Sequence, residues 1–199
     1  MVIPEENIQT ILEFVVLRIQ EHLSQRQQTL SKEPFILALS GLQGSGKSTY
    51  AGQLASTLRS QLHLTVLVCS LDDFYHKHHT LVKIRAQNPS NGLLRLRGQP
   101  GTHDEELTLQ FFKSLASSDR PLRIPVFDKS KFNGEGGRVP EDDWEVIFSN
   151  LPLDVVIFEG WCLGFQPLHD DDHERKWRVA HPKTELLDSN TAEPLPGAC

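Results

Sequence analysis

Between a short apolar run and a helical stretch, the chain reads Gly41-Leu42-Gln43-Gly44-Ser45-Gly46-Lys47-Ser48-Thr49. Its first eight residues match the pattern GxxxxGK[ST] at every fixed position. Glycines at such positions let consecutive backbone N–H groups turn toward a phosphate, and the positive end of the following helix adds to the attraction. We therefore expect these nine residues to bind the phosphates of a nucleotide, with Lys47 at the β- and γ-phosphates.

The surroundings of this loop predict a parallel sheet. Phe35-Ile36-Leu37-Ala38-Leu39 precedes it and is continuously apolar, as in a strand buried on both faces. A helical stretch from Lys47 to about Arg59 follows, and then a second apolar run over 64–69. Strand, helix and strand at this spacing are typical of a βαβ unit. With the clearest strand of the chain at 153–159, the sequence predicts the α/β three-layer fold of P-loop NTPases.

The remaining segments are expected to surround this sheet. Apolar residues recur at helical spacing from Asn7 to Leu23, so residues 1–30 should form an amphipathic helix that packs on a core at 34–167. Residues 74–103 are rich in glycine and proline, which favours mostly loop, with a short helix at 81–86.

Three further segments follow in the core. A helix capped by Thr102 or Asp104 should run to about Ser117. Residues 122–127 read as a weak strand, edge-like because of Pro125. Residues 129–140 are rich in glycine and read as a loop.

Three carboxylates follow predicted strands. Asp72 and Asp73 come directly after the second strand, and Glu159 ends the third. Ligand sites in open α/β sheets lie beyond the carboxyl ends of the strands, so these acids should overlook the phosphates. Asp72 could accept the proton of an attacking hydroxyl, and Ser48, Asp72 and Glu159 could hold Mg²⁺. The plainer alternative for each acid is a solvated residue at a turn or strand end.

The intervening loops supply the residues expected to bind a small anionic acceptor. Basic residues among glycines suit such a molecule, because arginine binds a carboxylate through two hydrogen bonds. Solvated surface charge is the alternative for each of them. The expected acceptor-binding residues are Asp73, Tyr75, Arg97, His103, Asp104, Lys129 and Arg138.

Composition excludes several classes of function. The 199 residues carry a formal net charge of −6, which gives no general attraction to nucleic acid or anionic lipid. No apolar run approaches the roughly 18 residues that span a bilayer. The acidic start resembles no targeting peptide, and three cysteines without CxxC spacing indicate a reducing compartment, so a cytoplasmic location is expected. The histidines at 76, 78 and 79 read as a polar loop in preference to a metal site, and oligomeric state is left open.

With these motifs in place, the sequence resembles the D-glycerate 3-kinase family and its fungal relatives, within the P-loop kinases that include uridine, pantothenate and phosphoribulo-kinases. The resemblance covers about 34–167 and rests on GLQGSGKST (41–49), SLDDFY (70–75), NPSNGLLRLRGQPGTHD (88–104), PVFDKSKFNGEGGR (125–138) and VVIFEGWCLGF (155–165). It implies ATP and Mg²⁺ as cofactors and phosphoryl transfer to a hydroxyl of glycerate or a similar small acid. It also implies Asp72 as the base and Glu159 near the metal. With Lys47, which the phosphate-binding motif supplies, these are the three expected catalytic residues.

Beyond Pro167 the chain departs from the pattern of this family, whose members continue into a helical region, a further strand and an arginine-bearing lid. We therefore expect a C-terminally incomplete kinase core, followed by a disordered tail at 168–199. The leading hypothesis is an ATP-dependent kinase that acts on D-glycerate. The alternatives are an ATP-binding P-loop protein without kinase turnover and a kinase of the uridine or pantothenate type.

Overall fold

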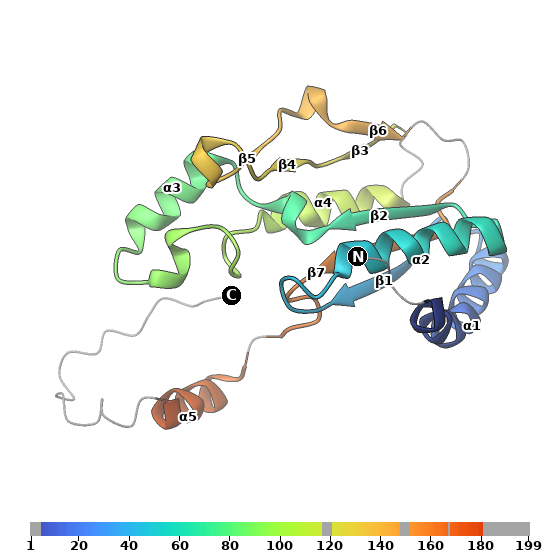
Figure 1. Cartoon of the computed structure of the whole chain (residues 1–199), viewed down its shortest axis with the longest axis horizontal. Helices are drawn as coiled ribbons and strands as arrows, with labels where there is room; N and C mark the ends of the chain where they lie inside the picture. Colours follow the sequence, from blue (N-terminus) through green and yellow to red (C-terminus); the bar gives the residue numbers. More distant parts are fainter. Residues whose placement is uncertain (1–4, 117–120, 148–151, 167, 181–199) are drawn as a thin grey trace. The chain divides into compact units, whose positions relative to one another are not determined.

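The computed structural model describes residues 5–116, 121–147, 152–166 and 168–180 (Figure 1). These residues fall into two compact units, which divide between Leu163 and Gly164. The first unit holds the phosphate-binding loop and all three predicted strands, and the second holds one helix.

A three-stranded parallel sheet forms the centre of the first unit. Its strands are β1 (Phe35–Ser40), β2 (Val66–Ser70) and β7 (Val155–Gly160), in the order β1-β7-β2. The central strand β7 is buried at all six residues, as its apolar sequence predicts. In the register of the strands, Ser40 pairs with Gly160 and Ser70 pairs with Glu159. The ends of the three strands, and therefore the loops that follow them, lie at one edge of the sheet.

Two apolar clusters cover the two faces of the sheet and confirm the three-layer fold. On one face, α1 (Glu5–Thr29) and α2 (Lys47–Leu62) pack through residues such as Ile19 and Leu58 against Val155 and Ile157. On the other face, α4 (Glu105–Ala116) packs through Phe111 and Leu115 against Val156 and Phe158. The inward residues of β7 thus alternate between the two layers, as the twofold period of a strand requires.

The segment expected as one weak edge strand forms two short strands on either side of Pro125. They are β3 (Leu122–Ile124), which pairs antiparallel with β6 (Glu145–Ile147), and β4 (Phe127–Asp128), which pairs antiparallel with β5 (Gly137–Arg138). Proline cannot donate a backbone hydrogen bond, so a continuous ladder is interrupted at this residue. The expected loop at 129–140 contains β5 and the 3₁₀ turn η3 (Phe132–Gly134), and η4 (Glu141–Asp143) follows it.

The glycine-rich stretch after β2 is more ordered than its composition predicts. It begins with the 3₁₀ turn η1 (Leu71–Phe74), continues into α3 (His78–Gln87) and then forms η2 (Gly92–Arg95). Helix α3 is longer than the expected 81–86 and has no buried residue, so apolar periodicity could not reveal it. Helix α4 begins after Asp104, whose Oδ1 accepts a hydrogen bond of 3.1 Å from Leu107 N. Of the two expected caps, Asp104 is the one used.

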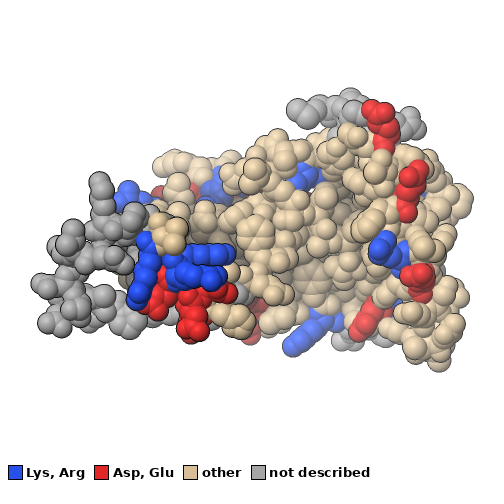
Figure 2. Space-filling view, turned by 90° about the horizontal axis from the view of Figure 1, so that it is seen from below, with Lys and Arg blue, Asp and Glu red and all other residues tan. Residues whose placement is uncertain are grey.

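The second unit contains α5 (Asp170–Ala180), in part of the segment where we expected a disordered tail. Its helix is supported by ion pairs between neighbouring turns, Asp172 with Arg175 at 2.6 Å and Glu174 with Arg178 at 2.5 Å. Figure 2 displays its mixed charge as a cluster of red and blue atoms. Residues 181–199 of the expected tail lie outside the described residues. None of the described helices has the combination of length and apolar character that crossing a bilayer requires.

One ion pair joins the end of α1 to the start of β7. Arg26 donates to Asp154 Oδ1 at 2.6 Å and to the Leu153 carbonyl at 2.7 Å, while Asp154 Oδ2 accepts from Thr65 N at 2.9 Å. Both charged side chains are mostly buried, at 12% and 19% exposure. The pair therefore anchors the helix to the sheet at the edge opposite the phosphate-binding loop.

We expect Arg26→Ala to lower the free energy of unfolding by about 2 kcal/mol, because it leaves a mostly buried carboxylate without its cation. Arg18→Ala is the matched control, since Arg18 lies on the same helix and its contacts, with the carbonyl and ring of Phe14, are exposed and within its own turn. Denaturant unfolding followed by circular dichroism measures both variants. Equal losses in the two would show that the Arg26 contact contributes nothing specific.

Candidate active site

The phosphate-binding loop has the backbone geometry that its glycines predict. Gly44 and Gly46 have φ of 76° and 85°, in the left-handed region that favours glycine, and Gly46 caps the 16-residue helix α2. Lys47, the first residue of this helix, donates from Nζ to the Leu42 carbonyl at 2.8 Å. The loop therefore closes on itself through Lys47 and leads directly into a helix N-terminus, which is the arrangement that binds phosphate.

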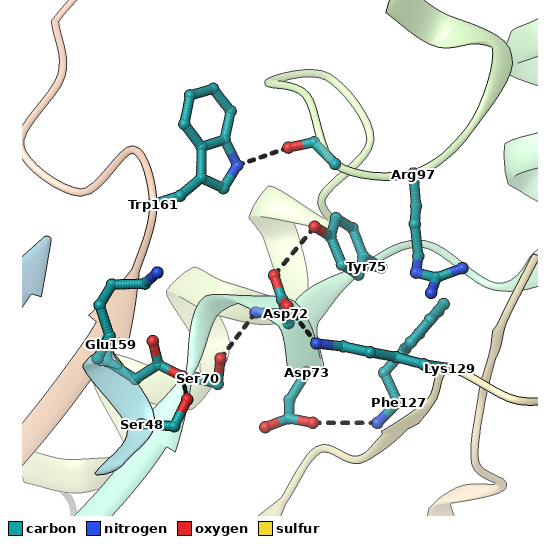
Figure 3. Close-up of polar contacts among 12 residues, drawn as sticks. Ser48, Ser70, Asp72, Asp73, Tyr75, Arg97, Phe127, Lys129, Glu159 and Trp161 are labelled. Atoms are coloured by element: carbon teal, nitrogen blue, oxygen red, sulfur yellow. Dashed lines mark hydrogen bonds and ion pairs between the residues drawn. The ribbon is translucent and has the colours of Figure 1, made fainter. Parts of the chain in front are cut away.

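A hydroxyl and a carboxylate meet beside this loop. Ser48 Oγ, in the first turn of α2, donates to Glu159 Oε1 at 3.0 Å (Figure 3). Glu159 comes from the end of the central strand and is only 6% exposed. A serine hydroxyl and a glutamate carboxylate are hard oxygen ligands, so this pair fits Mg²⁺. Both residues lie at the edge of the sheet where the sequence places them, and their role as metal ligands stays a prediction.

Asp72 lies on the neighbouring strand end, in η1, and both of its carboxylate oxygens have donors. Tyr75 OH donates to Oδ1 at 3.0 Å, and Lys129 Nζ lies 2.5 Å from Oδ2 (Figure 3). Burial raises the pKa of this carboxyl, but the hydrogen bond and charge of Lys129, together with Tyr75, outweigh it and hold the pKa below its usual value. Asp72 is therefore ionised at neutral pH. Its contacts within the described residues are with these donors and not with Ser48 or Glu159, so its expected role as a metal ligand stays a prediction.

Tyr75 is fixed by three neighbours. Its ring stacks on His103 at 4.3 Å between centroids, and its carbonyl accepts from Arg138 Nη2 at 2.7 Å. Burial and the negative charge of Asp72 raise the pKa of the Tyr75 hydroxyl, so it remains a proton donor to that carboxylate. Burial also lowers the pKa of His103 to about 4, which leaves its imidazole neutral at pH 7. The stacked Tyr75 and His103 side chains are therefore both neutral at pH 7.

Three of the expected acceptor-binding residues have partners within the protein framework. The side chain of Arg138 is 5% exposed and pairs with Asp104 at 2.8 Å, which ties β5 to the start of α4. Asp73 Oδ1 accepts from Phe127 N at 3.2 Å, and burial raises the pKa of this carboxyl. These residues shape the site by holding β4 and β5 beside η1.

Arg97 and Lys129 bring positive charge to the side of Asp72 away from the phosphate-binding loop (Figure 3). Arg97 Nη1 donates to the Gly134 and Glu135 carbonyls at 2.7 and 2.5 Å, and its guanidinium lies 5.5 Å from the centroid of the Phe127 ring. Lys129 follows β4 directly and has a side chain that is 59% exposed. Lys129 contacts the Asp72 carboxylate, and the charge of Arg97 acts on the Tyr75 hydroxyl.

Sequence reasoning missed several residues that shape the site. Ser70 Oγ accepts from Asp72 N at 3.3 Å and so caps η1, and a serine just before two aspartates is a capping signal that could have been recognised. Gly136 lies against Phe127 so closely that a Cβ at this position would overlap the ring at its Cε1 atom. Trp161 donates from Nε1 to the Gly98 carbonyl at 2.6 Å and so joins the end of β7 to the loop at 98. The sequence carries no local signal for the last two contacts.

His78, in the histidine cluster at 76, 78 and 79, has protein partners. His78 stacks on Phe132 at 3.8 Å and pairs with Glu135 at 2.8 Å. In the part of the chain that the structure describes, no group of three or more histidine, cysteine, aspartate or glutamate residues is placed to hold a metal ion. The expected loop is in part helical, because His78 and His79 are the first two residues of α3.

The known proteins that resemble this chain in sequence are kinases. No protein-family model matches the chain. It is 41% identical over 158 residues to the uncharacterized kinase mug58 of Schizosaccharomyces pombe, and 33% identical over 166 residues to the probable ATP-dependent kinase TDA10 of Saccharomyces cerevisiae. These matches cover 79% and 80% of this chain and 56% of each relative. The chain thus spans about half the length of the curated relatives it matches.

A solved structure agrees with the sequence comparison. The D-glycerate 3-kinase from Cryptococcus neoformans var. grubii superposes with a TM-score of 0.72 at 36% identity, over 92% of this chain and 62% of that protein. The matches in sequence and in fold point to the same group of proteins. Over the part that it shares with them, the chain belongs to the glycerate 3-kinase-like P-loop kinases.

Proposed function

We propose that the chain is an ATP-dependent kinase that transfers the γ-phosphate to a hydroxyl of a small anionic acceptor, with D-glycerate as the foremost candidate. The observation that carries the proposal is the edge of the sheet, where the Ser48–Glu159 pair at the phosphate-binding loop adjoins an ionised Asp72 flanked by cations. The similarity to two kinases and to a D-glycerate 3-kinase supports the same activity.

At the nucleotide end, the backbone N–H groups of 41–49 and the start of α2 bind the phosphates of ATP. Lys47 exchanges its contact with the Leu42 carbonyl for the β- and γ-phosphate oxygens. Ser48 and Glu159 would hold Mg²⁺, which when bound neutralises charge on the same phosphates. These groups stabilise negative charge that develops as the phosphoryl group leaves ADP.

At the acceptor end, Asp72 orients the attacking hydroxyl and takes its proton. The new bond joins the acceptor oxygen to the γ-phosphorus, and the bond between this phosphorus and the oxygen bridging to the β-phosphate breaks. Tyr75 holds the Asp72 carboxylate in place by its hydrogen bond to Oδ1. Arg97 and Lys129 provide the positive charge that attracts an anionic acceptor, and the net charge of −6 makes this attraction local to the site.

A coupled assay of ADP release tests the proposal. With ATP and Mg²⁺, we expect acceptor-dependent ADP release with D-glycerate and much less with uridine, pantothenate or ribulose 5-phosphate. Turnover with uridine or pantothenate alone would move the chain to that type of kinase. Binding of ATP without acceptor-dependent ADP release for any of the four would refute the kinase proposal and favour a nucleotide-binding protein without turnover.

A further inference from the structure

The contacts of Asp72 raise a problem for its role as a base. One carboxylate oxygen accepts from Tyr75, and the other is covered by the Lys129 ammonium at 2.5 Å. A base must present an oxygen within hydrogen-bond distance of the hydroxyl whose proton it takes. With both donors in place, an approaching hydroxyl competes with a cation for Oδ2, and the cation also makes the carboxylate a poorer proton acceptor.

The two donors to Asp72, Tyr75 and Lys129, differ in how easily they can move away from the carboxylate. Tyr75 is 2% exposed, stacks on His103 and has its own carbonyl held by Arg138, so its hydroxyl is fixed. The Lys129 side chain is 59% exposed and reaches Asp72 through a flexible four-carbon stem. Ion pairs of this exposure contribute little to stability, so a competing anion can break this one.

The backbone that carries Lys129 is nevertheless held firmly. Phe127 N donates to Asp73 Oδ1 at 3.2 Å, and Phe127 and Asp128 form the short strand β4. Asp128 Oδ1 then accepts from Ser130 N at 2.9 Å and from Ser130 Oγ at 2.6 Å. The ammonium can therefore move while its Cα stays in place, and it remains within reach of both Asp72 and a molecule bound beside it.

On the basis of the kinase activity proposed above, we propose that Lys129 is a specificity latch, which an anionic group of the acceptor draws away from Asp72, so that Asp72 Oδ2 becomes available to the hydroxyl of the same molecule. A hydroxy acid carries both groups, a carboxylate for Lys129 and a hydroxyl for Asp72. A neutral alcohol has nothing to offer the ammonium and meets a covered base. The latch thus selects small hydroxy acids by activating the base only when the anion is present.

A double-mutant cycle in acceptor binding tests the latch without requiring turnover. Calorimetry measures binding of D-glycerate and of glycerol to the full chain loaded with Mg²⁺ and a non-hydrolysable ATP analogue. We expect Lys129→Gln to weaken D-glycerate binding about tenfold or more, because it removes a charge-assisted contact, and not to weaken glycerol binding, because glycerol gains access to an uncovered Asp72 and loses no contact. Lys131→Gln, in the same loop, is the matched control and should leave both unchanged.

The decisive variant is Asp72→Asn, which removes the competitor of the acceptor for Lys129. The latch predicts that Asp72→Asn tightens D-glycerate binding by about fivefold, and that this gain disappears when Lys129 is already glutamine. A gain of equal size in both backgrounds would mean simple repulsion between two carboxylates and would overturn the latch. Wild-type binding of D-glycerate no tighter than that of glycerol would overturn it as well.

These outcomes separate the latch from the kinase proposal. A coupled cycle in binding together with no ADP release in the wild type would refute the kinase and leave the latch standing. ADP release together with additive effects of the Asp72 and Lys129 substitutions on D-glycerate binding would refute the latch and leave the kinase proposal standing. Thermal unfolding of each variant checks that it is folded, and Lys129→Met serves as a second neutral replacement of similar length.

Discussion

Replacing Asp72 with asparagine is expected to lower kcat for D-glycerate by about 10²- to 10⁴-fold, because it removes the group that takes the proton of the hydroxyl. The side chain keeps its size, and its amide oxygen can still accept from Tyr75, so the fold of η1 should persist. The loss should lie in kcat while nucleotide binding is retained. Steady-state kinetics by the coupled ADP assay, with nucleotide binding measured separately, checks both statements.

The neighbouring carboxylate provides the comparison for this variant. Asp73→Asn changes charge by the same amount one residue away, but the asparagine oxygen can still accept from Phe127 N. We expect a loss in kcat smaller than that of Asp72→Asn by at least about tenfold, because Asp73 acts on the position of β4 and not on the proton. Equal losses in the two variants would argue that Asp72 is not the base.

The second large effect is expected from Lys47→Ala. A nucleotide that binds only the folded state stabilises it by about 2.7 kcal/mol at a concentration of 100 times its Kd. Without Lys47 the loop loses the cation that bridges the β- and γ-phosphates, so we expect the rise in Tm on addition of ATP and Mg²⁺ to vanish. Thermal unfolding with and without nucleotide measures it directly.

A lysine far from the loop is the control for this prediction. Lys113 is exposed on α4, and Lys113→Ala should keep the full nucleotide-dependent rise in Tm. If Lys47→Ala also keeps it, residues 41–49 are not the nucleotide site, whatever their sequence pattern. A rise lost in both variants would point to a general loss of stability.

The sequence predicted correctly those parts of the molecule whose structure depends on residues close together in the chain. The loop at 41–49 has glycines at fixed offsets between an apolar run and a helix, and these features need no knowledge of distant residues. The strands were predicted in the same way, from short apolar runs. The order of the strands in the sheet could not be predicted in this way, because periodicity indicates which residues are buried but not which strands pair with one another. The position of β7 between β1 and β2 is visible only in the structure.

Contacts between segments far apart in sequence account for the rest. The pairing of Lys129 with Asp72 depends on where β4 runs, and β4 exists as a separate strand because Pro125 breaks the segment. Composition marked Arg138 and Asp104 as acceptor-binding residues, yet their mutual ion pair serves the framework. Charge in a loop predicts that a residue is polar, but whether it faces a ligand or another loop is decided by packing.

The order of strands in the sheet has a consequence for how the site comes into being during synthesis. β1 and β2 do not pair with each other, because each pairs with β7. Phe35 and Val66 therefore have the same partner in the sheet, Val155, which is made much later. Until the ribosome has made β7, the loop after β1 and the turn after β2 have no common strand to align them, and contacts of such long sequence separation form slowly. Glu159 arrives with that same strand. The nascent chain therefore acquires the sheet, the alignment of its two earlier loops and the partner of Ser48 in a single late step.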